Sequence, residues 1–252
     1  MKTTLFAVAL VVALALTATA QSKKPPVSQH RAGDPSATFQ PQSGAPAPPA
    51  LCKPCLFYGG DINTADQNAA GMSDENTLLI LGGSSSYGAI NLPFTATVQG
   101  IVFNVQASTA FDPQSATFDV RTGVTDGNGG TSVASGTGHM SVASTGRNFL
   151  GLNEYSVAVL IPAGVVLNAG EYWFNLTPTC TNVLDGSCSV FRQFVSNTTQ
   201  ETGALNGGWQ PIHEMFLNSD FFGFTFANWC DSSLGFNQNQ CAGMSFGVIG
   251  HK

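Results

Sequence analysis

The feature that most constrains the fold of this chain is the alternation of short β-prone runs with turn-forming residues. Runs rich in β-branched and aromatic residues are separated by clusters of Gly, Asn, Asp and Ser, and helix signals do not recur. This pattern predicts an all-β fold, an antiparallel β-sandwich resembling a jelly roll. The expected strands are residues 77–81, 98–106, 116–122, 132–136, 139–143, 155–161, 171–177, 190–195, 221–226 and 244–249.

Alternation within the expected strands indicates sheets with one buried face. Phe118 and Val120 share one face of their strand, whereas Asp119 and Arg121 share the other. Turn chemistry separates the strands: residues 126–129 read as a hairpin turn, and the Gly-Gly-Ser-Ser-Ser run at 82–86 also reads as a turn. Residues 182–218 break the rhythm and predict a long loop region carrying about one strand.

The first fifty residues predict export. Lys2 precedes an apolar run from Leu5 to Leu16, and Ala18-Thr19-Ala20 follows as a small-x-small cleavage site. The apolar run is shorter than the roughly 20 residues that a membrane-spanning helix needs. We therefore expect a signal peptide at residues 1–20, a Pro-rich disordered linker at 21–50, and a single β-sandwich domain at 51–252 in a secreted protein, extracellular or periplasmic.

The six cysteines fall into three close pairs, and an even number in an exported chain predicts disulfides. Local pairing is the simplest arrangement, although the spacing alone leaves other connectivities open. The Cys-Lys-Pro-Cys motif resembles a thioredoxin-like redox site, but no βαβ pattern surrounds it, so a structural role is favoured. The expected disulfide-forming residues are Cys52, Cys55, Cys180, Cys188, Cys230 and Cys241.

The charge of the expected domain restricts its partners. Between Leu56 and His251 there are three basic residues and fourteen Asp and Glu. Such a surface repels the phosphate backbone, which excludes nucleic acid as a partner. Divalent cations, neutral glycans and proteins remain open, and no segment of the expected mature chain is suited to crossing a membrane as a helix.

No catalytic motif is assembled in the sequence. His213-Glu214 begins like a zinc-protease motif, but the second histidine is missing, and no GxSxG nucleophile elbow occurs. Glutamates that would serve as a glycosidase pair are present, yet nothing in their spacing brings two of them together. We therefore expect no catalytic residues and no enzymatic activity.

Calcium is the one candidate cofactor. Asp61, Asn63 and Asp66 place oxygen ligands at short spacing beside glycines, which is the kind of donor set that hard cations prefer. The alternative is that these residues form Asx-turns, and the glycine and terminal glutamate of an EF-hand are missing.

Two tryptophans and an asparagine are candidate glycan ligands. Trp173 lies two residues from Asn175, and Trp209 lies in a Gly-Gly-Trp-Gln segment that suggests an exposed loop tip. The alternative for Trp173 is that its ring packs in the interior of the sandwich.

Several stretches resemble a domain of exported bacterial proteins, those with the PEP-CTERM type of C-terminal sorting signal. They are Phe57-Tyr58-Gly59-Gly60-Asp61, Val98-Gln99-Gly100-Ile101-Val102-Phe103, the segment 167–176 and the segment 244–250. The resemblance implies an uncharacterised β-sandwich with no catalytic residues to carry over. The sequence ends at His251-Lys252 without the sorting signal, so we expect release, not anchoring.

Together these features predict an exported non-catalytic β-sandwich protein that acts in surface, matrix or extracellular association. The alternative is a carbohydrate-binding module stabilised by calcium.

Overall fold

The computed structural model describes residues 48–62, 71–74, 83–107, 111, 113–149, 151–179, 193–198, 210–220, 222–228 and 243–252. The expected signal peptide, nearly all of the expected linker and the expected strand at 77–81 lie outside these residues. The described part is all-β and antiparallel, as the strand pattern predicted. It contains no helix long and apolar enough to cross a membrane.

The strands vary in length from two residues to nineteen. They are β1 (Cys55–Tyr58), β2 (Gly71–Ser73), β3 (Ser84–Leu92), β4 (Ala96–Ala107), β5 (Ser115–Thr122), β6 (Thr131–Phe149), β7 (Leu152–Leu167), β8 (Gly170–Thr179), β9 (Phe194–Thr198), β10 (Gln210–Ser219), β11 (Phe224–Asn228), β12 (Gly243–Met244) and β13 (Phe246–His251).

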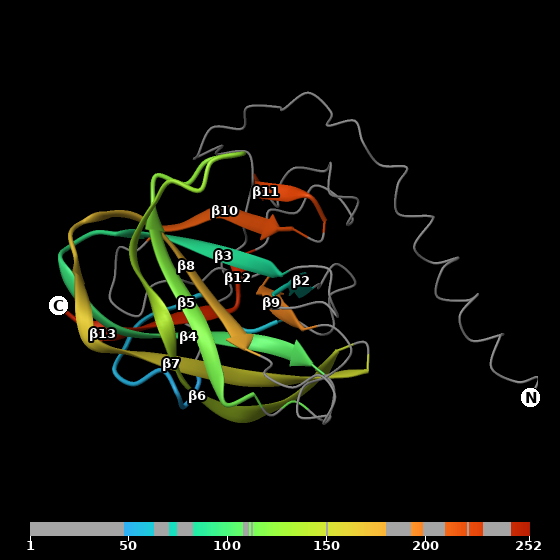
Figure 1. Ribbon diagram of the computed structural model, residues 1–252. Helices are drawn as coiled ribbons and strands as arrows, with labels where there is room; N and C mark the ends of the chain where they lie inside the picture. The colour runs from blue at the N-terminus through green and yellow to red at the C-terminus, as the bar shows by residue number, and fades with distance from the viewer. Residues whose placement is uncertain are drawn as a thin grey trace, which may run out of the picture.

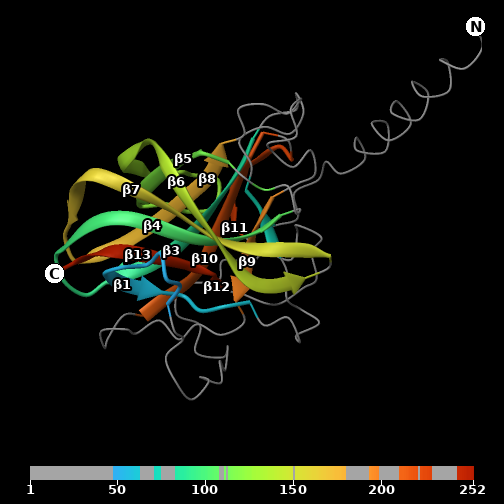
Figure 2. The same ribbon diagram turned by 90° about the horizontal axis from the view of Figure 1, so that it is seen from below.

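The strands form one continuous antiparallel path, β1-β13-β4-β7-β6-β5-β8-β3-β10-β11, which folds over on itself (Figures 1 and 2). Strand β6 connects the two halves of this path, because its first half pairs with β5 and its second half, from Met140, pairs with β7. We call β1, β13, β4, β7 and the second half of β6 sheet A, to which β9 also pairs. The first half of β6 with β5, β8, β3, β10 and β11 is sheet B.

The main core lies between the two sheets. Phe246 on β13 packs against Phe103 and Phe57 within sheet A and against Phe174 of sheet B, with ring centroids 5.1–6.1 Å apart. The opposing strand β3 approaches closely at Gly88, where an added Cβ would lie 2.8 Å from the Phe246 ring. The core therefore depends on a small residue opposite a large one.

Several strand assignments differ from the sequence prediction. β1, β2 and β10 were not expected, and β10 lies in the region predicted as a long loop, which also holds β9. The Ser-rich run at 82–86 is not a turn, because Ser84 and Ser86 are buried at the start of β3. Residues 132–136 and 139–143 are parts of one strand, because β6 pairs with β5 through Gly136 and Gly138, where Phe118 and Val159 leave little room for a side chain. The predicted hairpin turn at 126–129 is confirmed between β5 and β6.

Both sheets also carry buried side chains on their outer faces, and the two sets of side chains differ in chemistry. The outer face of sheet A carries buried polar residues, including Asn104, Gln106, Glu154 and Ser156. The outer face of sheet B carries a second apolar cluster, separate from the main core, of Tyr87, Ala89, Val124, Trp173, Phe216 and Phe226. These two faces hold the candidate functional residues.

Candidate functional site

The polar residues on sheet A follow from strand alternation. Phe103 and Val105 of β4 point into the main core, so Asn104 and Gln106 between them point outward. In a half-exposed sheet these positions would face water, but Asn104 and Gln106 are buried. Buried amides require hydrogen-bond partners, and neighbouring strands supply them to the NH2 groups of both side chains, whereas Asn104 Oδ1 has no partner among the described residues.

Glu154 on β7 is the centre of this arrangement. Its carboxylate is only 1% exposed, and it accepts hydrogen bonds from Ser196 at 2.6 Å and from Thr145 at 2.9 Å. Arg147 on β6 forms an ion pair with the same carboxylate through Nε, and its Nη2 lies 3.0 Å from Asp61 Oδ1. Burial opposes the charge of Arg147, but the carboxylates of Glu154 and Asp61 outweigh it and raise the arginine pKa.

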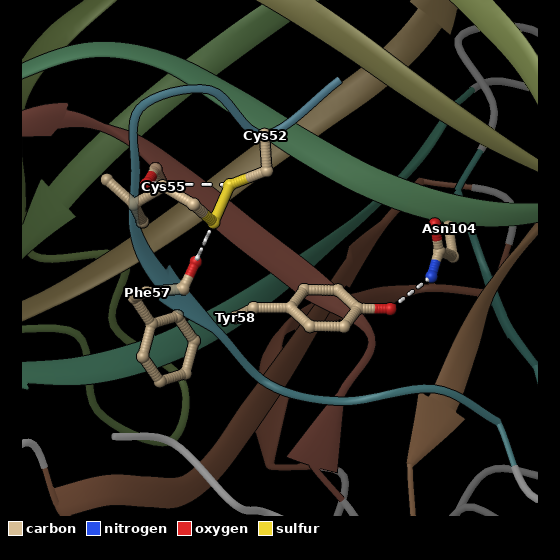
Figure 3. Close-up of a disulfide and its surroundings, with 6 residues drawn as sticks. Cys52, Cys55, Phe57, Tyr58 and Asn104 are labelled. Carbon is tan, nitrogen blue, oxygen red and sulfur yellow. Dashed lines mark hydrogen bonds between the residues drawn. A yellow bond between two sulfur atoms is a disulfide. The ribbon is translucent and has the colours of Figure 1, made fainter. Parts of the chain in front are cut away.

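Tyr58 connects this ion pair to the centre of the sheet. Asn104 Nδ2 donates to the Tyr58 hydroxyl at 2.8 Å (Figure 3). It also donates to Ser245 Oγ at 2.7 Å, and the Tyr58 hydroxyl donates to Asp61. Burial, followed by the negative charge of Asp61, raises the pKa of Tyr58 far above its usual value. The phenol therefore stays a proton donor at neutral pH. We call Tyr58, Asp61, Asn104, Gln106, Arg147, Glu154, Ser196 and Ser245 the sheet A network.

A disulfide between Cys52 and Cys55 lies next to the network, as local pairing predicted (Figure 3). Cys52 is buried against Val102, Ala158 and Ile249 on the outer face of sheet A. Cys55 Sγ lies 3.2 Å from the carbonyl oxygen of Phe57, a contact and not a hydrogen bond, because a disulfide sulfur carries no proton. The bridge thus holds the start of β1 down on the sheet. Cys180, Cys188, Cys230 and Cys241 lie outside the described residues.

The structure places the predicted glycan ligands of sheet B in the interior. Trp173 is 2% exposed and packs edge-on against Phe216, with ring centroids 6.3 Å apart. Asn175 is also buried and donates to Asp74 Oδ1 at 3.1 Å and to the Ser86 carbonyl at 2.9 Å. Trp173 is therefore buried, but it packs in the separate cluster on the outer face of sheet B and not between the sheets, as the alternative had it. Trp209 lies outside the described residues.

Arg121 and Asp119 border the aromatic cluster of sheet B. Their side chains form an ion pair, and Tyr87 donates to Asp119 Oδ2 at 3.1 Å. The Arg121 guanidinium carbon lies 5.1 Å from the ring centroid of Phe226 and 6.0 Å from that of Tyr87. Burial and then the charge of Asp119 raise the pKa of Tyr87 above its usual range.

Of the three predicted calcium ligands, the structure describes only Asp61. Asp61 is engaged by Tyr58 and Arg147, and Asn63 and Asp66 lie outside the described residues. Within the described ranges, no group of three or more His, Cys, Asp or Glu side chains is arranged to hold a metal ion. Calcium binding therefore stays a prediction.

No family model, curated protein or solved structure matches the chain. The resemblance to the domain of PEP-CTERM proteins therefore stays a prediction.

Sequence reasoning missed the sheet A network, except for Asp61. One signal was available, because Arg121 and Arg147 are two of only three basic residues between Leu56 and His251. Each arginine forms an ion pair in the structure. A scarce cation in an acidic β-domain is thus a reasonable place to search for a structural ion pair.

Proposed function

We propose that this protein is exported and acts outside the cytoplasm by non-catalytic association with a protein surface. The order of basic, apolar and small residues at the N-terminus supports export, and the Cys52–Cys55 disulfide suits an oxidising compartment. The engagement of Glu154 and Asp61 by Arg147 supports a structural role for these carboxylates.

The observation that carries the proposal is an apolar bulge on β7. Leu160 pairs with Gly100 and Val165 pairs with Val98, so residues 161–164 stand opposite Gln99 alone. Leu160 is 62% exposed and Val166 is 66% exposed, more than any other large apolar side chain in the described ranges. The segment 160–166, Leu-Ile-Pro-Ala-Gly-Val-Val, contains no charged residue. We call residues 160–166 the β7 bulge.

The β7 bulge suits a contact made by apolar burial. Exposed apolar side chains are common singly, but a contiguous uncharged segment that projects from a strand is typical of an interaction site. The acidic body would repel an acidic partner at long range, so the contact energy has to come from buried apolar area at the bulge. A protein partner with an apolar surface fits these properties.

Photocrosslinking in cultures of producing cells tests this proposal. A Leu160→p-benzoylphenylalanine variant should form a defined adduct, and Thr137→p-benzoylphenylalanine, at an exposed position on β6, is the matched control. Unlabelled wild-type protein should compete for the adduct, whereas a Leu160→Ser/Val166→Ser protein should not. N-terminal sequencing of the released protein should begin at Gln21.

Equal adducts from positions 160 and 137, or equal competition by the double variant, would reject the bulge as the contact surface. Recovery of the protein only inside cells with residues 1–20 intact would reject export. An adduct with the mass of two copies would identify the partner as the protein itself. The alternative function, a carbohydrate-binding module, depends on a different surface.

A further inference from the structure

The outer face of sheet B presents a grid of side chains that suits a ligand. Strands β5, β8 and β3 are neighbours, and their register places outward-facing residues side by side. One row combines a cation, an indole and a small residue, and the next combines a carboxylate, an amide and a phenol. The rows are Arg121, Trp173 and Ala89, and Asp119, Asn175 and Tyr87.

The indole N–H of Trp173 is the first sign that this grid is not purely structural. Trp173 Nε1 is buried, yet it has no hydrogen-bond partner among the described residues. Buried Trp side chains usually satisfy this donor, because leaving it unpaired forfeits its hydration without replacement. In this structure the grid therefore contains a buried N–H donor that lacks an acceptor among the described residues.

Phe226 is the second sign, because it covers the grid in a strained conformation. Between the pairs Leu217–Ala227 and Ser219–Phe224, Asn218 stands opposite two residues, so β11 has a bulge that includes Phe226. Phe226 has φ +41°, a left-handed value that is uncommon for a bulky residue. The bulge aims its ring at Tyr87, with centroids 5.1 Å apart, and at Arg121.

We propose that Phe226 is a displaceable cover over a binding surface for a neutral saccharide ring, formed by Tyr87, Trp173, Asp119 and Arg121. Strain at Phe226 and the unpaired Trp173 N–H both raise the free energy of the closed state. Displacement of the ring relieves both when a ligand supplies an acceptor to the indole. Strand β11 ends the described path of sheet B and pairs with β10, while the Gly127 N–H donates to the Phe226 carbonyl oxygen at 3.0 Å. The Phe226 ring, which no hydrogen bond holds, is therefore the part best suited to move.

The chemistry of the uncovered surface selects the ligand class. A pyranose has an apolar C–H face that can replace the Phe226 ring against Tyr87, and hydroxyl groups that can accept from the Trp173 N–H. Asp119 and Arg121 cancel each other in charge and offer an acceptor and several donors to hydroxyl groups. A charged ligand would have to break this ion pair, so a neutral sugar fits better.

This inference is independent of the proposed association through the β7 bulge. The bulge lies on sheet A, and the grid lies on the outer face of sheet B. Failure of either experiment therefore leaves the other proposal standing.

Gly129 provides a way to displace the cover without replacing any residue of the grid, although the added Cβ also crowds the Arg121 guanidinium. A Cβ at this position would lie 2.8 Å from Phe226 Cζ and 2.8 Å from Arg121 Nη1. Gly129→Ala should therefore push the Phe226 ring away. Phe226→Gly is the second variant, because glycine accepts the positive φ and removes the ring. Gly136→Ala is the matched control, since its new Cβ would lie 3.1 Å from the Phe118 ring instead.

Affinity electrophoresis of the full chain through gels containing soluble β-1,3-glucan, xyloglucan or galactomannan measures binding. We expect Gly129→Ala and Phe226→Gly to bind at least one polysaccharide about tenfold more tightly than wild type, because they remove the cost of opening. Gly136→Ala should bind like wild type. Adding Trp173→Phe to Gly129→Ala should reverse the gain, since it keeps an aromatic ring but removes the N–H donor.

A second measurement tests the cover directly. In a Trp209→Phe/Trp229→Phe background, acrylamide should quench the fluorescence of Trp173 more strongly after Gly129→Ala than before it. Unchanged quenching, or no binding of any variant to any of the three polysaccharides, would overturn the proposal. Binding that N-acetylphenylalanine amide competes away and free sugars do not would also overturn it, because the ligand would then be an aromatic peptide side chain.

Discussion

The outer faces of the two sheets are stabilised mainly by different contacts. On sheet A, buried Glu154 is held by a charge-assisted hydrogen bond from Arg147 and by two hydroxyl donors. On sheet B, aromatic rings form the main cover, with Asn175 and Thr177 hydrogen-bonded to Asp74 beside them, and the ion pair of Arg121 with Asp119 lies at the border of the rings, partly exposed. A buried hydrogen-bond network loses stability when any one partner is removed, whereas packed aromatic rings can shift and repack. This contrast suggests a fixed face on sheet A and an adaptable face on sheet B.

The strongest way to break the comparison is to remove one arginine from each face. Arg147→Met leaves the Glu154 carboxylate buried without its cation, and we expect the free energy of unfolding to fall by about 3 kcal/mol, the low end for a broken buried pair because Arg147 is partly exposed. Arg121→Met should lower it by only about 1 kcal/mol, because Tyr87 and Ser132 still donate to Asp119. Urea unfolding followed by circular dichroism measures both, and equal losses would refute the distinction.

The disulfide adds a covalent constraint to the fixed face. Replacing both partners, Cys52→Ala and Cys55→Ala, should lower the free energy of unfolding by about 2 kcal/mol, the chain-entropy value for so short a loop. The protein should still fold, because the bridge restrains the start of β1 and does not build the main core. Urea unfolding gives the loss, and a protein that fails to form sheet A would contradict this local role.

The two buried tyrosines sharpen the comparison through pH. Tyr58 on sheet A and Tyr87 on sheet B both have a pKa raised by burial and then by a neighbouring carboxylate. The folded state therefore keeps protons that the unfolded state releases above about pH 10, so stability holds below that pH and falls above it. The slope should reach about 1.4 kcal/mol per pH unit for each tyrosine.

Urea unfolding between neutral and strongly alkaline pH tests this dependence. Tyr58→Phe and Tyr87→Phe should each make the alkaline decline shallower, and the double variant should have the smallest slope. If Tyr58→Phe leaves the decline unchanged, then the network around Asp61 does not hold the phenol in its protonated form. That result would make the two faces more alike than the contacts indicate.

The sequence predicted the strands whose own residues carry the pattern. β4, β5, β7 and β8 have alternating apolar residues, and each was expected close to its observed position. β3 was missed because it begins with serines and carries Gly88, where a side chain would meet Phe246 and Met244 from distant strands. No local window contains that information. Tertiary packing, and not propensity, decides this segment.

The candidate sites were predictable to a smaller extent. Asp61 and Trp173 were identified as notable, but the first was assigned to calcium and the second to an exposed surface. Their actual partners, Arg147 and Phe216, come from other strands, so only the sheet register could reveal them. The strain at Phe226 likewise depends on the β10–β11 bulge, which is a property of pairing and not of composition.

The position of β13 has a consequence for how the chain is made. β13 separates β1 from β4 in sheet A, although about 140 residues of synthesis lie between β4 and β13. Until residues 246–251 leave the ribosome, the backbone groups of Val98–Phe103 have no partner on that side, and Phe57 and Phe103 lack Phe246. β4, β7 and β6 can pair with one another earlier, so the β1–β13–β4 edge is the part of sheet A that forms late.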